Sequence, residues 1–110
     1  MRSPVERLWG ALGRGDWSAM AAQFVPDARV HDAVTGEAVA PAEYVTRARV
    51  AGRAEVTLER VISESNDVAV IATVGRDGRT RQCGAFYALR DGRIARVVEF
   101  WAGGPAEQPR

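Results

Sequence analysis

The chain has 110 residues and a formal net charge of +1, from 15 basic and 14 acidic side chains. This length suits a single domain, and its 46% hydrophobic and 26% charged residues are ordinary for a globular protein. The nearly neutral balance gives no electrostatic reason to expect binding to nucleic acid or to a membrane surface. All 15 basic residues are arginine, which excludes lysine Schiff-base chemistry and a P-loop lysine.

The sequence holds one histidine and one cysteine, which excludes an internal disulfide and a structural zinc site of the Cys/His kind. It has no apolar run long enough for a membrane span, and no hydrophobic signal core before Glu6 and Arg7. We therefore expect a cytoplasmic protein that needs neither a metal nor another cofactor.

Three helices are predicted in the first half of the chain. Ser3, Pro4 and Glu6 have the spacing of a capping box, so a first helix begins there and ends at Gly13 or Gly15.

Asp16 can cap a second helix, which is expected to include Phe24 and to end at Pro26. Pro41 opens a third helix, which ends near Gly52.

Strands dominate the second half, where the hydrophobic period changes to two. A short strand at 28–32 precedes the third helix, and four longer strands, separated by turn-forming pairs, follow it. These four are predicted at 54–65, 68–75, 80–89 and 94–101. Arg60 has the parity of the apolar Leu58, so a bulge is expected in the first of them. Residues 103–110 have no apolar period and should form a loose tail.

Several short motifs occur in an order that is found in one known family. They are Gly15-Asp16-Trp17, Pro26-Asp27-Ala28, Val30-His31-Asp32, and Asp91-Gly92-Arg93-Ile94 followed by Glu99-Phe100-Trp101. With the order of helices and strands, they resemble the NTF2-like superfamily, in its SnoaL-like and ketosteroid-isomerase-like branch. The resemblance implies an α+β cone in which three N-terminal helices pack on a curved antiparallel sheet around a central pocket. It covers about residues 5–102 of a single domain predicted at 1–102, and it implies a homodimer.

Asp32 is the first candidate for a catalytic residue. It aligns with the aspartate that serves as general base in the ketosteroid isomerases that the sequence resembles. Its alternation with Ala28 and Val30 places the carboxylate on the inner face, where desolvation would raise its pKa. The alternative is that Asp32 ends the strand and caps the turn before Gly36.

Glu99 is the second candidate. It shares a strand face with Val97 and with Trp101, which stands where the family has a pocket tryptophan. The alternative is an exposed strand residue. If Glu99 and Asp32 both face one poorly hydrated pocket, they should titrate as a coupled pair, with at least one raised pKa.

The sequence departs from the ketosteroid isomerases at both oxyanion donors. The donor tyrosine of the first helix falls on Leu8 and the donor aspartate of the next-to-last strand falls on Ala85. Without these donors, steroid isomerisation is not expected.

Two arginines are candidate cations of the pocket. They are Arg81 and Arg49, and Arg49 stands where the isomerases have a pocket tyrosine. The alternative is that both are solvated.

The pocket wall is expected to be mostly apolar. Its predicted lining residues, besides Arg49 and Arg81, are Leu8, Trp9, Val70, Ala72, Cys83, Ala85, Tyr87, Val97 and Trp101. His31 alternates with Asp32 and should face away from this pocket. Cys83 is expected to be a core residue because no histidine can be assigned to activate it.

These features predict a cofactor-independent acid/base enzyme of the isomerase, cyclase or epoxide-hydrolase type, acting on a small apolar organic molecule. The alternative is a non-catalytic ligand-binding or dimerisation module of the same fold.

The outer face of the sheet is expected to carry Phe86, Val98 and Phe100. These apolar side chains would be exposed in a monomer, so they also predict a homodimer.

Overall fold

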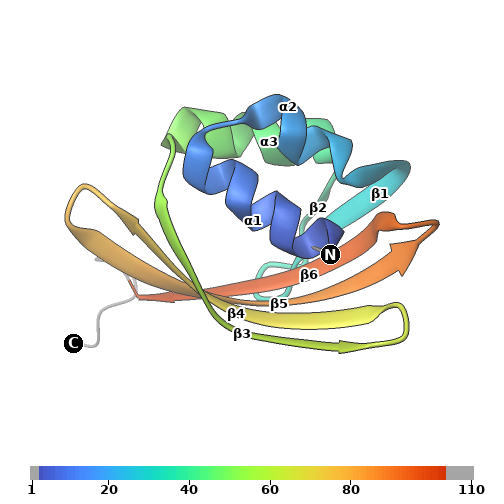
Figure 1. Cartoon of the computed structure of the whole chain (residues 1–110). Coiled ribbons are helices and arrows are strands. Elements are labelled where there is room, and N and C mark those ends of the chain that lie inside the picture. Colours follow the sequence, from blue (N-terminus) through green and yellow to red (C-terminus); the bar gives the residue numbers. More distant parts are fainter. Residues whose placement is uncertain (1–2, 104–110) are drawn as a thin grey trace.

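The computed structural model describes residues 3–103, in which three helices cover one side of a six-stranded sheet (Figure 1). The helices are α1 (Pro4–Arg14), α2 (Trp17–Ala22) and α3 (Pro41–Ala51). The strands are β1 (Phe24–Asp32), β2 (Ala38–Val39), β3 (Glu55–Glu64), β4 (Asp67–Arg76), β5 (Arg79–Arg90) and β6 (Arg93–Gly103). The α+β architecture predicted from the sequence is confirmed.

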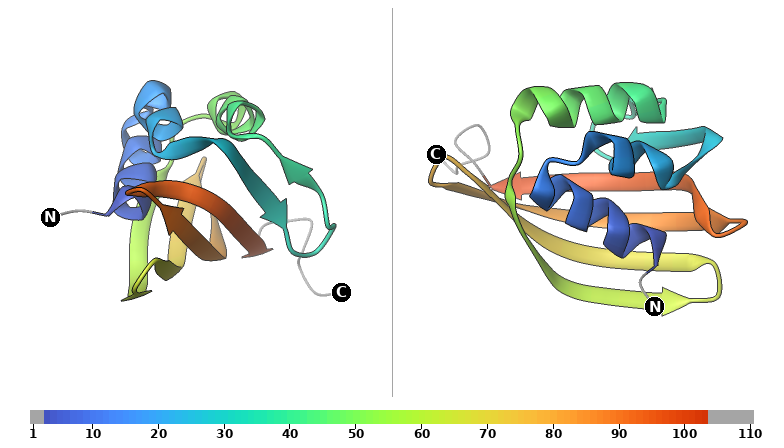
Figure 2. Two further views of the ribbon diagram at one scale, coloured as in Figure 1. Left: turned by 90° about the vertical axis from the view of Figure 1, so that its right-hand side faces the viewer. Right: turned by 45° about the horizontal axis from the view of Figure 1, so that its top comes forward.

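The sheet has the strand order β2-β1-β6-β5-β4-β3. Its four long C-terminal strands form the predicted antiparallel meander, whereas β1 adds to β6 in parallel. The sheet curves beneath the helices without closing into a barrel (Figure 2). The inner face of this curved sheet and the helices above it enclose the core.

Local capping explains where the first two helices begin. The Ser3 hydroxyl accepts from the Glu6 amide while the Glu6 carboxylate accepts from the Ser3 amide, so the predicted capping box is present. Gly15 ends α1 in the left-handed conformation, at φ 70°. Asp16 then caps α2 by accepting from the Ala19 amide at 3.1 Å.

The second helix is shorter than predicted. It ends at Ala22, and Phe24 already belongs to β1, so β1 begins well before the expected residue 28. Pro26 is tolerated inside β1 because the register against β6 shifts between Phe24 and Arg29, and such an irregularity needs no ladder donor from proline. The two-residue strand β2 was not predicted.

The meander agrees with the sequence at its bulge and at two of its turns. The register of β3 against β4 shifts between Leu58 and Arg60, which is the predicted bulge. Asp77-Gly78 and Asp91-Gly92 both have positive φ at each residue, as two-residue hairpin turns require.

The C-terminal strand is longer than predicted. Gly103 pairs with Arg81 as the last residue of β6, so it does not belong to a loose tail. The rest of the predicted tail, 104–110, lies outside the described residues.

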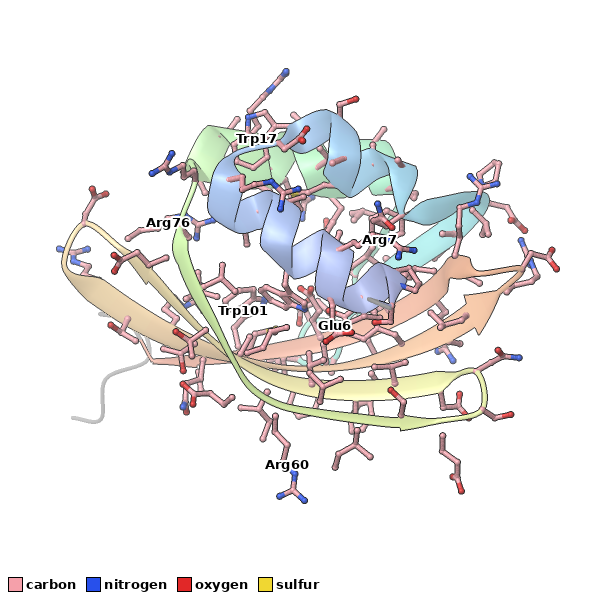
Figure 3. The ribbon with its side chains drawn as sticks, in the orientation of Figure 1. Glu6, Arg7, Trp17, Arg60, Arg76 and Trp101 are labelled. Atoms are coloured by element: carbon pink, nitrogen blue, oxygen red, sulfur yellow. The ribbon has the colours of Figure 1, made fainter. Side chains whose placement is uncertain are left out.

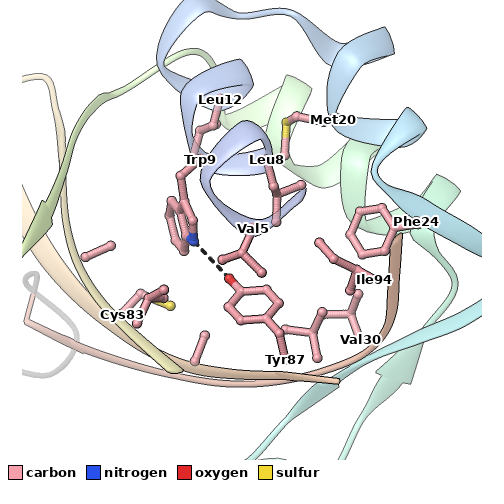
Figure 4. Close-up of a cluster of buried hydrophobic side chains, with 14 of the residues drawn as sticks. Val5, Leu8, Trp9, Leu12, Met20, Phe24, Val30, Cys83, Tyr87 and Ile94 are labelled. Carbon is pink, nitrogen blue, oxygen red and sulfur yellow. Dashed lines mark hydrogen bonds between the residues drawn. The ribbon is translucent and has the colours of Figure 1, made fainter. Parts of the chain in front are cut away.

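Trp9 and Tyr87 stand at the centre of the core, where the Trp9 indole Nε1 donates to the Tyr87 hydroxyl at 2.9 Å (Figure 4). The predicted pocket does not extend into this region, because side chains from the helices and from the sheet pack against one another here and fill that part of the cone. The residues that were predicted to line the pocket and are instead packed in this core are Leu8, Val70, Ala72, Cys83, Ala85, Tyr87 and Val97.

Within residues 3–103, none of the helices has the length and apolar character that crossing a membrane requires.

Candidate functional site

A cavity of about 340 Å³ lies between the three helices and the inner face of the sheet. Apolar side chains from all three helices and from β1 form much of its wall, and charged residues line the remainder. Of the predicted substrate-binding residues, Trp9, Arg81 and Trp101 line this cavity. A larger and more open hollow of about 820 Å³ borders the β4–β5 hairpin, but it has no buried acid.

Glu99 is a buried acid in the cavity wall, with 6% of its surface exposed, so it faces inward as its parity predicted. Its Oε2 accepts from the Tyr44 hydroxyl at 2.5 Å and its Oε1 accepts from the Trp101 indole Nε1 at 3.0 Å. Burial raises the pKa of Glu99, the two hydrogen bonds oppose this rise, and the charge of Asp32 adds to it. Glu99 therefore takes up a proton more readily than a glutamate in water.

Asp32 lies beside Glu99 because β1 pairs with β6 in a register that sets these two residues opposite each other. Its carboxylate borders the cavity, but its Oδ1 accepts from the backbone amides of Val34 at 2.8 Å and Thr35 at 3.0 Å. These bonds lower the pKa of Asp32. The expectation that desolvation raises this pKa is wrong, and the alternative, a strand end that caps the following turn, is confirmed.

Tyr44 is a polar residue of the site that the sequence did not assign. It projects from α3 into the cavity wall, where its ring also makes an edge contact with Phe24 at 5.9 Å between centroids. Burial, followed by the charge of Glu99, raises its pKa well above 10, so the hydroxyl keeps its proton. A tyrosine on the inner face of a helix needs a hydrogen-bond partner. This need is the sequence feature that could have predicted a hydrogen bond from Tyr44 to Glu99.

Trp101 connects the acid to an arginine. Its ring lies 6.4 Å from that of Trp9, and the guanidinium carbon of Arg81 lies 5.1 Å from the Trp101 ring centroid. Arg81 thus reaches the cavity as one of the two predicted cations.

The other predicted cation, Arg49, does not reach the cavity. Tyr44, Ala48 and Ala51 mark the inner stripe of α3, and Arg49 falls outside it and is exposed. Arg47 borders the cavity instead, where it pairs with Glu37 at 3.0 Å and with Glu43 on the exposed side of the helix.

His31 and Cys83 have no place in this hydrogen-bond network. His31 pairs in register with Val98, but it borders the cavity, so the prediction that it faces away from the pocket is wrong. Cys83 is buried in the core, and burial raises the pKa of its thiol, so it remains protonated at neutral pH.

Structures of known proteins share this fold. The chain is similar to a proposed ketosteroid isomerase from Kribbella flavida, with 21% identity over 97% of this chain and 81% of that one and a TM-score of 0.82. It is also similar to IdmH, a proposed polyketide cyclase from Streptomyces antibioticus, with 15% identity, coverage of 89% and 88%, and a TM-score of 0.78. A third similar structure is AclR, a proposed hydroxylase from Streptomyces galilaeus, with 15% identity, coverage of 97% and 85%, and a TM-score of 0.80.

These three proteins carry different reaction names on one architecture, and identities this low establish the fold alone. A search of curated proteins gave no significant match. The sequence profile of the SnoaL-like domain matches residues 5–97. This match spans most of the chain, and the curved sheet with its covering helices agrees with it, so the chain belongs to the SnoaL-like domain family.

Proposed function

We propose that the protein catalyses proton transfer on a small, largely apolar organic molecule, with Glu99 as the general base. The observation that supports this role is the buried carboxylate of Glu99 in the cavity wall, held by the donors of Tyr44 and Trp101. A carboxylate whose pKa is raised toward neutrality is still ionised in part at neutral pH, and it is a stronger base than an ordinary glutamate. The size and the apolar part of the wall suit a compact organic substrate.

The two donors differ in what they can do when Glu99 receives a proton. The Trp101 indole can only donate, so Oε1 of Glu99 stays an acceptor and the proton resides on Oε2. The Tyr44 hydroxyl can accept from that Oε2 proton, which turns its own hydrogen away from Glu99.

The turned Tyr44 hydroxyl can then donate to a substrate oxygen on which charge develops. In this scheme a proton leaves a carbon next to a carbonyl group, the electron pair stays on the substrate as an enolate, and Tyr44 stabilises the enolate oxygen. Where a carbon–carbon double bond is conjugated with the enolate, return of the proton from Glu99 to the far carbon of that bond shifts the double bond and gives an isomer. Attack of the enolate on a second carbonyl, with protonation of the new alkoxide, gives a ring.

Asp32 has an electrostatic role in this proposal. Hydrogen bonds from the turn keep it ionised, and its negative charge, opposite Glu99 in register, disfavours a second negative charge. Asp32 therefore helps Glu99 to hold a proton, and does not itself need to accept one.

The test is hydrogen exchange. A panel of small ketones and 1,3-dicarbonyl compounds is incubated with the protein in D₂O, and deuterium at the carbon next to the carbonyl group is followed by NMR. We expect accelerated exchange of at least one compound and a loss of about 10²–10⁴-fold in Glu99→Gln. Glu64→Gln, at an exposed end of β3, is the matched control and should retain the rate. Exchange that persists in Glu99→Gln would contradict the proposal, and binding without exchange would favour a ligand-binding module.

We also propose that two copies of the chain pair through the outer face of the sheet. Phe86 and Phe100 are 56% and 42% exposed there, with ring centroids 6.0 Å apart, and Ile62 and Ile71 extend the apolar surface. A monomer rarely leaves such a patch in water. This proposal concerns assembly and is independent of the chemistry of Glu99.

The homodimer predicts a specific response to charge on that face. Phe86→Glu would place a carboxylate inside the interface, so we expect the variant to sediment as a monomer with unchanged circular dichroism, while the wild type sediments as a dimer at micromolar concentration. Val50→Glu is the control, because Val50 is an equally apolar exposed residue on α3, away from the sheet. A wild-type mass near that of one 11.9 kDa chain would rule out the dimer.

A further inference from the structure

Two arginines occupy one wall of the cavity, and the scheme above does not use them. Arg76 ends β4 and Arg81 lies near the start of β5, and both line the cavity. Val74 is opposite Arg81 in register, so Arg76, two residues further along β4, is its diagonal neighbour on the same face. Diagonal neighbours lie about 7–8 Å apart, within reach of two long side chains. Two positive charges therefore border the same space.

Arg76 is half-buried, on the helix side of the sheet (Figure 3). Its Nε donates to the carbonyl oxygen of Gly52, at the end of α3, at 2.8 Å. Among residues 3–103, no carboxylate lies within ion-pair distance of Arg76, and no residue accepts from its two Nη groups. Burial, and then the charge of Arg81, lower the pKa of Arg76, which means that its positive charge is poorly compensated.

Arg81 is oriented by the same tryptophan that holds the base. Its guanidinium lies over the Trp101 ring and its Nε donates to the carbonyl oxygen of Gly103 at 3.3 Å. Trp101 in turn donates to Glu99. Arg81, over the face of the indole ring, and Glu99, at its Nε1 edge, thus contact the same tryptophan in one cavity.

We propose that Arg76 and Arg81 form a subsite for the carboxylate group of a small, otherwise apolar organic acid. The reactive carbon of this acid would lie against Glu99, and that part rests on the proposed function. Guanidinium groups suit a carboxylate because their paired N–H donors match its two oxygens. A monoanion fits better than a phosphate dianion, because Asp32 and Glu37 also border the cavity and would repel additional negative charge.

Binding can be measured without any turnover. Isothermal titration calorimetry compares trans-cinnamate with trans-cinnamamide, which has nearly the same shape and no charge, and phenyl phosphate is the third probe. We expect cinnamate to bind about tenfold more tightly than the amide, because hydrogen bonds from a guanidinium to a charged carboxylate are stronger than those to a neutral amide. Arg76→Gln should remove this preference and leave the affinity for cinnamamide unchanged.

Arg81→Gln should have the same effect, and it keeps the test decisive if the Gly52 contact makes Arg76→Gln unstable. The matched control is Arg79→Gln, because Arg79 is exposed and pairs with Arg76 in register, yet borders the larger hollow and not this cavity. Arg79→Gln should keep the preference for cinnamate.

The subsite is overturned by equal affinities for cinnamate and cinnamamide, by an equal loss in Arg79→Gln, or by tighter binding of phenyl phosphate. No binding of cinnamate at low millimolar concentration overturns it as well. Glu99→Gln separates the subsite from the proposed function, because this variant should lose hydrogen exchange and still prefer cinnamate. If wild-type exchange is absent while the preference is present, the subsite stands and the catalytic proposal falls.

Discussion

Replacing Glu99 with glutamine is expected to stabilise the protein at neutral pH and to have little effect on stability at pH values well below 4.5, the ordinary glutamate pKa. Burial raises the pKa of Glu99 in the folded protein, so the folded state holds this proton more tightly than the unfolded chain does. The free energy of unfolding of the wild type therefore falls as the pH rises from 4.5 to the pKa of the folded state. Each pH unit between these two pKa values costs about 1.4 kcal/mol.

Glutamine can satisfy both neighbours of Glu99. Its carbonyl oxygen can accept from Trp101, and its amide can donate to the Tyr44 hydroxyl, which accepts as well as donates. The substitution therefore removes the cost of a buried charge and keeps a hydrogen bond to each neighbour, while the Tyr44 hydrogen turns from residue 99 toward the cavity. Urea unfolding of the wild type and Glu99→Gln across pH 3–8 gives this difference directly. A variant that is less stable than the wild type at pH 7 would contradict the proposed burial cost.

The neighbouring acid should behave in the opposite way. The pKa of Asp32 is lowered by its bonds to the turn amides, so its stabilising contribution is present above the unfolded-state pKa and is lost as the pH falls through the folded-state pKa. The sequence alone predicted a coupled pair with at least one raised pKa and did not distinguish the two acids. The structure predicts a gain for Glu99→Gln only.

The signals that predicted the helices and turns are local. Ser3 and Glu6 form a capping box within one turn, and Asp77-Gly78 closes a hairpin through its own positive φ values. Pro26 shows where local signals fail. It suggested the end of a helix, but pairing with β6, more than sixty residues away along the chain, places it in an irregular part of a strand.

Strand alternation placed Asp32 and Glu99 on the inner face but could not distinguish their environments. Asp32 ends its strand, so the free amides of Val34 and Thr35 reach its carboxylate, whereas Glu99 lies inside its strand and is covered by Tyr44. The Tyr44 contact joins residues 55 positions apart, and only the packing of α3 on the sheet brings them together.

The alternation of side chains along a strand also does not show which part of a sheet face is packed in the core and which part borders a cavity. Val97 and Glu99 share a face, yet Val97 is packed in the core and Glu99 borders the cavity. The difference depends on the bulk of Trp9 and Tyr87, which meet across the cone. Arg76 was not assigned to the pocket because the strand was predicted to end at residue 75, one residue before it, whereas β4 includes Arg76.

Tyr44→Phe is expected to raise the pKa of Glu99 further and to slow hydrogen exchange. The ring keeps its size, so Glu99 stays buried while the hydrogen bond to Oε2, which opposes the rise in pKa, is lost. Because the proposed scheme also uses this hydroxyl to stabilise the enolate, the maximal exchange rate should fall about 10²–10³-fold. The pH at which exchange is half-maximal should move upward with the pKa of Glu99.

Tyr87→Phe is the matched control. Tyr87 is more deeply buried than Tyr44 and its pKa is also raised by burial, but its hydroxyl accepts from Trp9 and makes no hydrogen bond to Glu99. This variant leaves the Trp9 donor unpaired, so it should lower the free energy of unfolding by about 1–3 kcal/mol while the pKa of Glu99 stays close to its wild-type value. Carbon NMR of glutamate labelled at Cδ reports this pKa in all three proteins. If the pKa of Glu99 in Tyr44→Phe equals that in Tyr87→Phe, Tyr44 does not tune the base, and the assigned hydrogen bond has no part in catalysis.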